Sequence, residues 1–92
     1  MIRVGYANSF LRRFRKLEPA FQKEVRMRIG EFRNPRNHQK LAVHKLKGIM
    51  TGTFAFSVNY RDRVVFEWSR DKKIAYLLDI GDHSISNDFY GP

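Results

Sequence analysis

Three apolar runs with the alternation of β-strands, all between His44 and His83, constrain the fold of this 92-residue chain most strongly. The segment begins with a basic loop that contains Gly48 and Gly52, and it ends at a Gly-Asp-His turn. The loop and the turn can meet only if the strands between them lie side by side. The pattern therefore predicts a sheet that brings side chains from both ends of the segment to one surface.

Each of the three runs has a different character. Residues 53–59 alternate apolar side chains with small or polar ones, which predicts a strand with one buried face and one shallow, trough-like face. Residues 64–68 are apolar enough for a central strand, and residues 74–80 form the last strand. The turns between them are expected at residues 60–62 and 69–72.

The first part of the chain predicts one strand and two helices. Alternating apolar residues in 2–6 indicate the strand, and Asn8 or Ser9 is expected to cap the first helix. Pro19 suits the start of a second helix that ends at about Arg33. The apolar stripes that we expect in the core are Phe10, Leu11, Phe14 and Leu17 on the first helix and Phe21, Val25, Ile29 and Phe32 on the second.

The order of these elements predicts a single α+β domain over residues 1–92. The expected order is β-α-α-β-β-β, with a two-helix hairpin packed on one face of a mostly antiparallel sheet. A chain of this length has room for one shared core. Because no apolar run approaches the length of a signal peptide or a membrane span, we expect a cytoplasmic protein without a membrane partner.

Basic residues are concentrated in the first half of the chain. Residues 1–52 contain thirteen Lys and Arg against three Glu, whereas residues 53–92 contain five against six acidic residues. The net charge is +9, and such one-sided charge favours a polyanionic partner such as nucleic acid. The alternative is a solvated basic helix face on a soluble protein.

The available side chains favour some kinds of chemistry over others. The chain has no cysteine, its three histidines lack metal-ligand spacing, and residues 48–52 do not form a phosphate-binding loop, so we expect neither metal nor cofactor. The remaining groups are nitrogen bases, cations and one phenol: His44, Lys45, Lys47, Arg61, Arg63, His83 and Tyr90. A single loop histidine such as His38 is more often exposed than catalytic.

These groups match the needs of a ribonuclease. RNA carries its own nucleophile, the 2′-hydroxyl, beside each phosphate. Such an enzyme therefore needs a base for that proton, cations for the charge on phosphorus and an acid for the leaving oxygen. Histidine can serve as base or acid, because its unperturbed pKa of about 6.5 lies close to neutral pH.

The element order and several short motifs resemble the RelE/ParE superfamily of bacterial toxins over nearly the whole chain. The motifs are KLKG at Lys45–Gly48, FAFSVNYRDRVVFEW at Phe54–Trp68 and YLLDIGDH at Tyr76–His83. The resemblance implies a toxin held inactive by a cognate acidic antitoxin, which meets DNA only indirectly through that complex. For the RelE-like branch it also implies cleavage of mRNA in the A site of the ribosome, through attack by the 2′-hydroxyl.

The resemblance also implies roles for individual residues. Arg63 matches the arginine before the central strand and would stabilise the phosphate. His83 stands where RelE-like toxins have an arginine and YafQ-like toxins a histidine, which makes it the candidate acid, and His44 resembles the first histidine of the YafQ-like type, a candidate base. The full set of catalytic candidates is His44, Arg63, His83 and Tyr90, and the RNA-binding candidates are Arg12, Arg13, Lys45, Lys47, Arg61 and Phe89.

Departures from the family pattern leave alternatives open. RelE has lysines on the strand that corresponds to Phe54–Val58, where this chain has Ala55 and Ser57, so His44 is the natural substitute as base. Either Phe89 or Tyr90 matches the aromatic residue that stacks on a base. The alternative functions are inhibition of DNA gyrase, as in the ParE branch, and nucleic-acid binding without catalysis.

Overall fold

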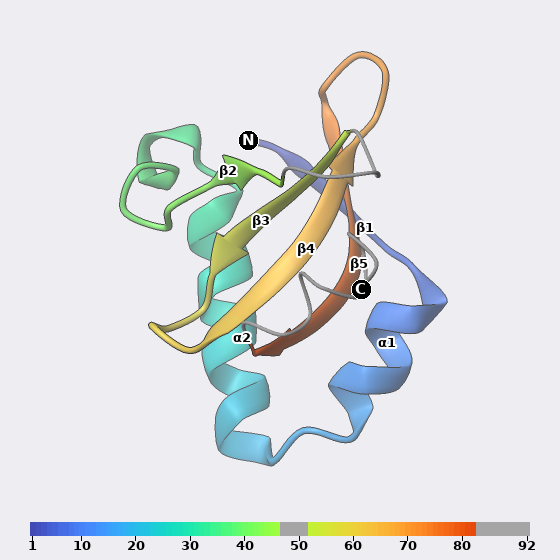
Figure 1. The fold of residues 1–92 in the computed structure, drawn as a ribbon, viewed down its shortest axis with the longest axis vertical. Coiled ribbons are helices and arrows are strands. Elements are labelled where there is room, and N and C mark those ends of the chain that lie inside the picture. Colours follow the sequence, from blue (N-terminus) through green and yellow to red (C-terminus); the bar gives the residue numbers. More distant parts are fainter. Residues whose placement is uncertain (47–51, 83–92) are drawn as a thin grey trace.

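Within the described part of the chain, five strands form one mixed sheet in the order β1-β5-β4-β3-β2 (Figure 1). The computed structural model describes residues 1–46 and 52–82. The strands are β1 (Arg3–Tyr6), β2 (His44–Lys45), β3 (Thr53–Ser57), β4 (Asp62–Trp68) and β5 (Ile74–Asp82). The helices are α1 (Asn8–Arg15) and α2 (Pro19–Phe32), followed by the 3-10 turn η1 (Pro35–Asn37).

The predicted α+β class and element order are confirmed, with the short strand β2 as an addition. Only β1 and β5 are parallel, and the other neighbouring strands are antiparallel. Strand ends differ from the prediction because pairing extends them: Asp62, expected in a turn, pairs with Asp82, which was expected beyond the last strand. The strand expected at 53–59 ends at Ser57.

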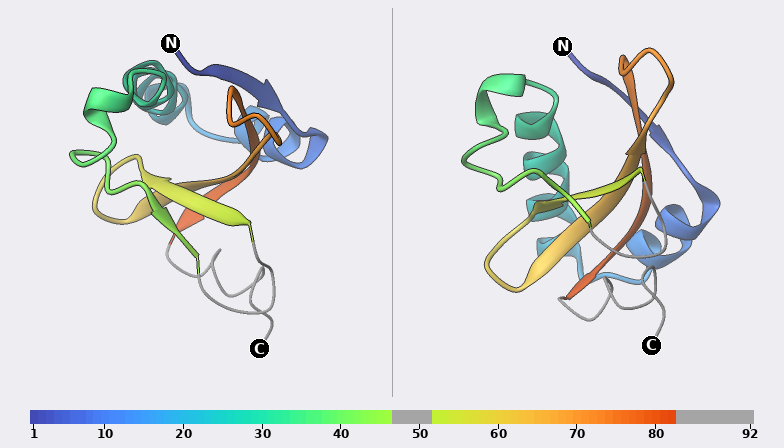
Figure 2. Two further views of the ribbon diagram at one scale, coloured as in Figure 1. Left: turned by 90° about the horizontal axis from the view of Figure 1, so that it is seen from above. Right: turned by 45° about the horizontal axis from the view of Figure 1, so that its top comes forward.

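The hydrophobic core lies between the sheet and the helices. In Figure 1, α2 crosses behind the sheet, and α1 lies beside the part of β5 that β1 does not cover. Phe32 of α2 is fully buried and stacks on Phe56 of β3 at a centroid distance of 4.4 Å. Phe10 and Leu77 are buried in the same cluster, so the expected apolar stripes of both helices do face the core. Figure 2 shows this arrangement from two further directions.

The start of α1 is attached to a bulge in β5. Val65 pairs with Asp79 but Phe66 pairs with Leu77, so Leu78 is the extra residue in β5. The hydroxyl of Ser9 donates to the carbonyl oxygen of Leu78. The expected cap at Asn8 or Ser9 is therefore wrong: the cap residue is Ala7, which has no capping side chain, because Ser9 bonds to the bulge instead.

Candidate functional site

Two of the predicted catalytic residues lie on the face of the sheet opposite the helices, here called the open face. His44 is paired with Ala55, and Ala55 is paired with Val65. Two residues further along β3, Ser57 is paired with Arg63. Because paired residues share a face, His44 and Arg63 point to the same side, and strand spacing places their Cα atoms about 12 Å apart.

The middle of the open face contains a small apolar cluster. Leu46, Ala55 and Val65 are buried there, and Leu78 packs against them. Thr53 is buried as well. The prediction that the small side chains of this strand leave a shallow trough is therefore wrong at Thr53 and Ala55, which are covered. Ser57, next to Arg63, is half-buried.

The backbone before β2 orients the imidazole of His44. The Nδ1 atom lies 2.8 Å from the carbonyl oxygen of Ala42, and a carbonyl can only accept a hydrogen bond. Nδ1 therefore carries hydrogen, and Nε2 holds the lone pair of the neutral ring. Ala42 has a φ of 54°, in the left-handed region, and its N–H donates to the carbonyl of Gln39 at 3.1 Å. This turn thus presents an exposed histidine whose Nε2 can accept a proton.

The hairpin between β3 and β4 places the two predicted arginines differently. Arg63 is half-buried in β4 and makes no ion pair with any residue in 1–46 or 52–82. Arg61 is exposed at the turn, with Nε 3.4 Å from Oδ2 of Asp62. Asn59 accepts hydrogen bonds from the backbone amides of Arg61 and Asp62 through Oδ1, which closes the turn. Arg63 is thus the arginine available for a ligand on the open face.

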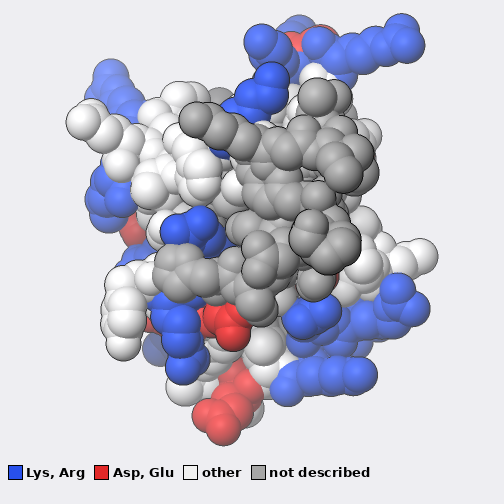
Figure 3. All heavy atoms as spheres, in the orientation of Figure 1, with Lys and Arg blue, Asp and Glu red and all other residues white. Residues whose placement is uncertain are grey.

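The other described RNA-binding candidates on β2 and α1 lie outside the open face of the strands that carry His44 and Arg63. Lys45 pairs with Phe54, whose side chain packs against the core, so Lys45 belongs to the opposite face of the sheet. Arg12 and Arg13 are exposed on α1, and Figure 3 shows Lys and Arg gathered over this helix. They line a hollow of about 490 Å³, in which Nε of Arg13 is 3.0 Å from Oδ1 of Asp79. Arg12 has no such partner among the described residues.

Four of the predicted residues lie outside the part of the chain that the structure describes: Lys47, His83, Phe89 and Tyr90. Within the described part, no group of three or more His, Cys, Asp or Glu residues is placed to hold a metal ion. No helix there is long and apolar enough to cross a membrane.

His38 has a structural role. Its Nε2 lies 2.8 Å from the carbonyl oxygen of Phe32, and its ring stacks on the Phe32 ring at 5.0 Å. The carbonyl oxygen of His38 accepts the N–H of Val43 at 2.9 Å, so His38 also supports the turn that precedes His44.

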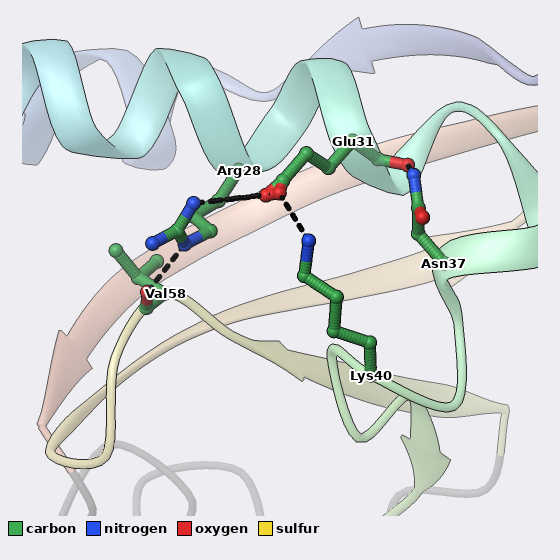
Figure 4. Close-up of polar contacts among 5 residues, drawn as sticks. All are labelled: Arg28, Glu31, Asn37, Lys40 and Val58. Carbon is green, nitrogen blue, oxygen red and sulfur yellow. Dashed lines mark hydrogen bonds and ion pairs between the residues drawn. The ribbon is translucent and has the colours of Figure 1, made fainter.

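A polar network that the sequence pattern did not indicate connects α2 to the turn before His44, through Lys40, and to the hairpin before Arg63, through the carbonyl oxygen of Val58 (Figure 4). Glu31 lies 2.8 Å from Nη1 of Arg28 and 3.1 Å from Nζ of Lys40. The hydrogen bond from Lys40 is the main reason that the pKa of Glu31 is lowered, with a further contribution from the charge of Arg28. Glu31 and Lys40 are separated by an irregular turn, so no periodic spacing signals this pair.

Similar structures were found, although no family model and no curated protein matches the sequence. A chain of the toxin-antitoxin complex RelBE2 from Mycobacterium tuberculosis is 18% identical, with a TM-score of 0.67 and coverage of 89% of this chain and 98% of that one. The intact RelBE complex from E. coli gives the same identity and TM-score, with 89% and 96% coverage. A double arginine-to-alanine mutant of E. coli RelE in the free state has a TM-score of 0.70 at 15% identity, with 97% and 93% coverage. The fold that the sequence resemblance implied is confirmed.

Proposed function

We propose, on the premise that this chain has the fold of the RelE toxins, that it is the toxin of a toxin-antitoxin system and cleaves mRNA on the ribosome. An acidic antitoxin would hold it inactive by binding as a protein partner. The observation that carries the proposal is the placement of His44 and Arg63 on one face of the sheet, with the Nε2 of His44 free to accept a proton.

The cleavage would proceed without a nucleophile from the protein. Nε2 of His44 takes the proton of a 2′-hydroxyl, and that oxygen attacks the adjacent phosphorus. The guanidinium of Arg63 stabilises the charge that develops on the phosphate oxygens. The bond to the 5′-oxygen then breaks, and an acid, for which His83 is our candidate, protonates the leaving group. The products are a 2′,3′-cyclic phosphate and a 5′-hydroxyl.

The side chains between His44 and Arg63 are compatible with this arrangement. Ala55 and Ser57 are the β3 residues that pair with them, and both are small. No long side chain of β3 therefore stands between the imidazole and the guanidinium on the open face. RelE has lysines on the corresponding strand, and Ala55 and Ser57 cannot act as a base in their place. His44 would supply the base instead.

The predicted RNA-binding residues would hold RNA without taking part in proton transfer. Arg12 and Arg13 on α1, together with Lys45, Lys47 and Arg61, would contact ribosomal RNA or mRNA phosphates. Phe89 or Tyr90 would stack on a base, and Tyr90 is also a candidate for a catalytic role.

Primer extension on cellular mRNA after induction tests the proposal. The wild-type chain should produce cuts within translated messages. His44→Ala, Arg63→Ala and His83→Ala should each reduce cutting by about 10²-fold or more. Glu67→Gln is the matched control, because Glu67 is exposed on the open face of β4 but has no proposed role, and it should cut like the wild type.

Two outcomes would support the alternatives. Intact messages together with DNA breaks would favour a gyrase inhibitor of the ParE type. Binding to nucleic acid without cuts, DNA breaks or growth arrest would favour a basic binding module.

A further inference from the structure

A groove rich in arginine runs between β1 and α2, on the side of the sheet that carries the helices. Its volume is about 450 Å³. The residues that line it, here called the arginine groove, are Arg3, Val4, Tyr6, Arg26, Ile29, Gly30 and Arg33. Neither His44 nor Arg63 belongs to it, so it is separate from the site proposed above.

The arginine groove continues into an apolar hollow beside α1. This hollow has a volume of about 240 Å³, and it shares Tyr6, Arg26 and Ile29 with the groove. Its other lining residues are Phe10, Leu11 and Phe14. The guanidinium of Arg26 lies 5.2 Å from the ring centroid of Phe14, so a cation stands directly beside the apolar floor.

The arginines of the groove have few partners within the described part of the chain. Nε of Arg33 donates to the carbonyl oxygen of Ile2 at 3.0 Å, and the pKa of Asp71 is lowered mainly by the Ser69 hydroxyl, with a small contribution from the charge of Arg3. Arg3, Arg26 and Arg33 form no ion pair with residues 1–46 or 52–82, and no acidic residue lines the groove. The two glutamates of α2 face elsewhere: Glu24 accepts a hydrogen bond from Asn59, and Glu31 pairs with Arg28 and Lys40. The groove therefore presents arginines that have no ion-pair partner among the described residues, next to a partly exposed apolar surface.

We propose that the arginine groove and its apolar extension bind an acidic amphipathic helix of a partner protein. The apolar floor requires aliphatic or aromatic side chains, because burying them removes apolar surface from water. The three guanidinium groups require carboxylates, with which arginine forms paired hydrogen bonds. An RNA backbone would satisfy the charges but would leave the floor unfilled.

The geometry of α2 specifies the spacing of the acidic groups. Arg26 lies in α2, and Arg33 is the helical-region residue that caps its C-terminus, seven positions later; this separation corresponds to about 10 Å along the helix axis. Carboxylates two turns apart on the partner helix would match them. Gly30 lies between the two arginines, and a Cβ built there has no atom within 4 Å, so the partner can approach the helix backbone closely.

This inference concerns protein binding and does not depend on RNA cleavage. The antitoxin of the proposed function is one protein that could carry such a helix. A test without RNA therefore separates a failure of this inference from a failure of the proposed ribonuclease.

The experiment uses a displayed library of random 16-residue peptides, panned against the full-length chain. Enriched peptides, synthesised with a fluorophore, are then titrated by fluorescence anisotropy. We expect them to carry Asp or Glu about two turns apart with apolar residues between. Gly30→Trp, which fills the groove, and Arg26→Glu should each weaken binding at least about tenfold.

Matched controls are available on the same helices. Ala20→Trp adds the same side chain to an exposed position in the first turn of α2, and Arg15→Glu reverses an exposed charge on α1. Both should change the affinity by less than about twofold. Thermal unfolding of Gly30→Trp checks that its fold is intact. If it is not, the peptide affinity of Arg26→Glu tests the inference independently.

Three results would overturn the inference. In the first, panning enriches no acidic amphipathic sequences. In the second, the enriched peptides bind Gly30→Trp and Arg26→Glu as tightly as the wild type. In the third, an equal concentration of single-stranded oligouridylate displaces the peptides. The last result would identify the groove as an RNA-binding surface.

Discussion

Arg28 donates a hydrogen bond from Nε to the carbonyl oxygen of Val58 at 2.9 Å, and this bond attaches the β3–β4 hairpin to the middle of α2. The same guanidinium pairs with Glu31, which also accepts a hydrogen bond from Lys40 in the turn before β2 (Figure 4). One helix thus supports both segments that lead to the candidate site, the hairpin before Arg63 and the turn before His44.

Replacing Arg28 should therefore lower stability. Arg28→Met removes the bond to Val58 and the ion pair with Glu31, and we expect the free energy of unfolding to fall by about 2 kcal/mol. Urea denaturation measures the change. Arg15→Met is the control, because Arg15 is exposed and has no described partner, and it should stay within about 0.5 kcal/mol of the wild type. Equal effects of the two variants would show that the Arg28 contacts contribute nothing.

The lowered pKa of Glu31 predicts a pH-dependent contribution to stability. The hydrogen bond from Lys40 favours the ionised carboxylate in the folded state, so the contribution is present above the pKa of the unfolded chain. It is lost as the pH falls through the lower folded pKa. The stability difference between wild type and Glu31→Gln should therefore be largest at neutral pH and should shrink as the pH falls below the unfolded value of about 4.3. A difference that is constant over this range would contradict the prediction.

Gly5 and Tyr76 form a cross-strand pair in which the absence of a side chain matters. A Cβ at Gly5 would lie 2.6 Å from Cδ1 of Tyr76, so the ring would have to move. We expect Gly5→Ala to cost about 1–3 kcal/mol in urea denaturation. In a Tyr76→Ala background the same substitution should cost much less, and this double-mutant cycle isolates the steric term. Gly30→Ala, with open space around its Cβ, should be neutral or stabilising.

Charge reversal at the two adjacent arginines of α1 should separate binding from stability. Arg12 is unpaired among the described residues, whereas Arg13 pairs with Asp79 across to β5. If each contacts one phosphate of single-stranded RNA, Arg12→Glu and Arg13→Glu should each reduce the slope of log K against log[salt] by about 0.7. Arg13→Glu should also lower stability by up to about 1 kcal/mol, since Arg13 is largely exposed. An unchanged salt slope in both variants would remove α1 from the RNA-binding surface.

Local periodicity was sufficient to predict most elements of the fold. The apolar stripe of α2 and its start at Pro19 depend on residues three or four positions apart, and both are confirmed. The predicted cap of α1 was wrong because it depends on a contact between residues far apart in the sequence. Ser9 has a suitable side chain, but its hydroxyl binds Leu78, which is 69 residues away in the sequence.

The sequence alone determined the class and order of elements, because alternation and helical spacing are properties of neighbouring residues. Only the tertiary structure decided which side chains meet. The strand register placed His44 and Arg63 on one face and Lys45 on the other, and a single-residue shift would have reversed those faces. Such pairings depend on contacts between distant residues, whose energies no local pattern encodes.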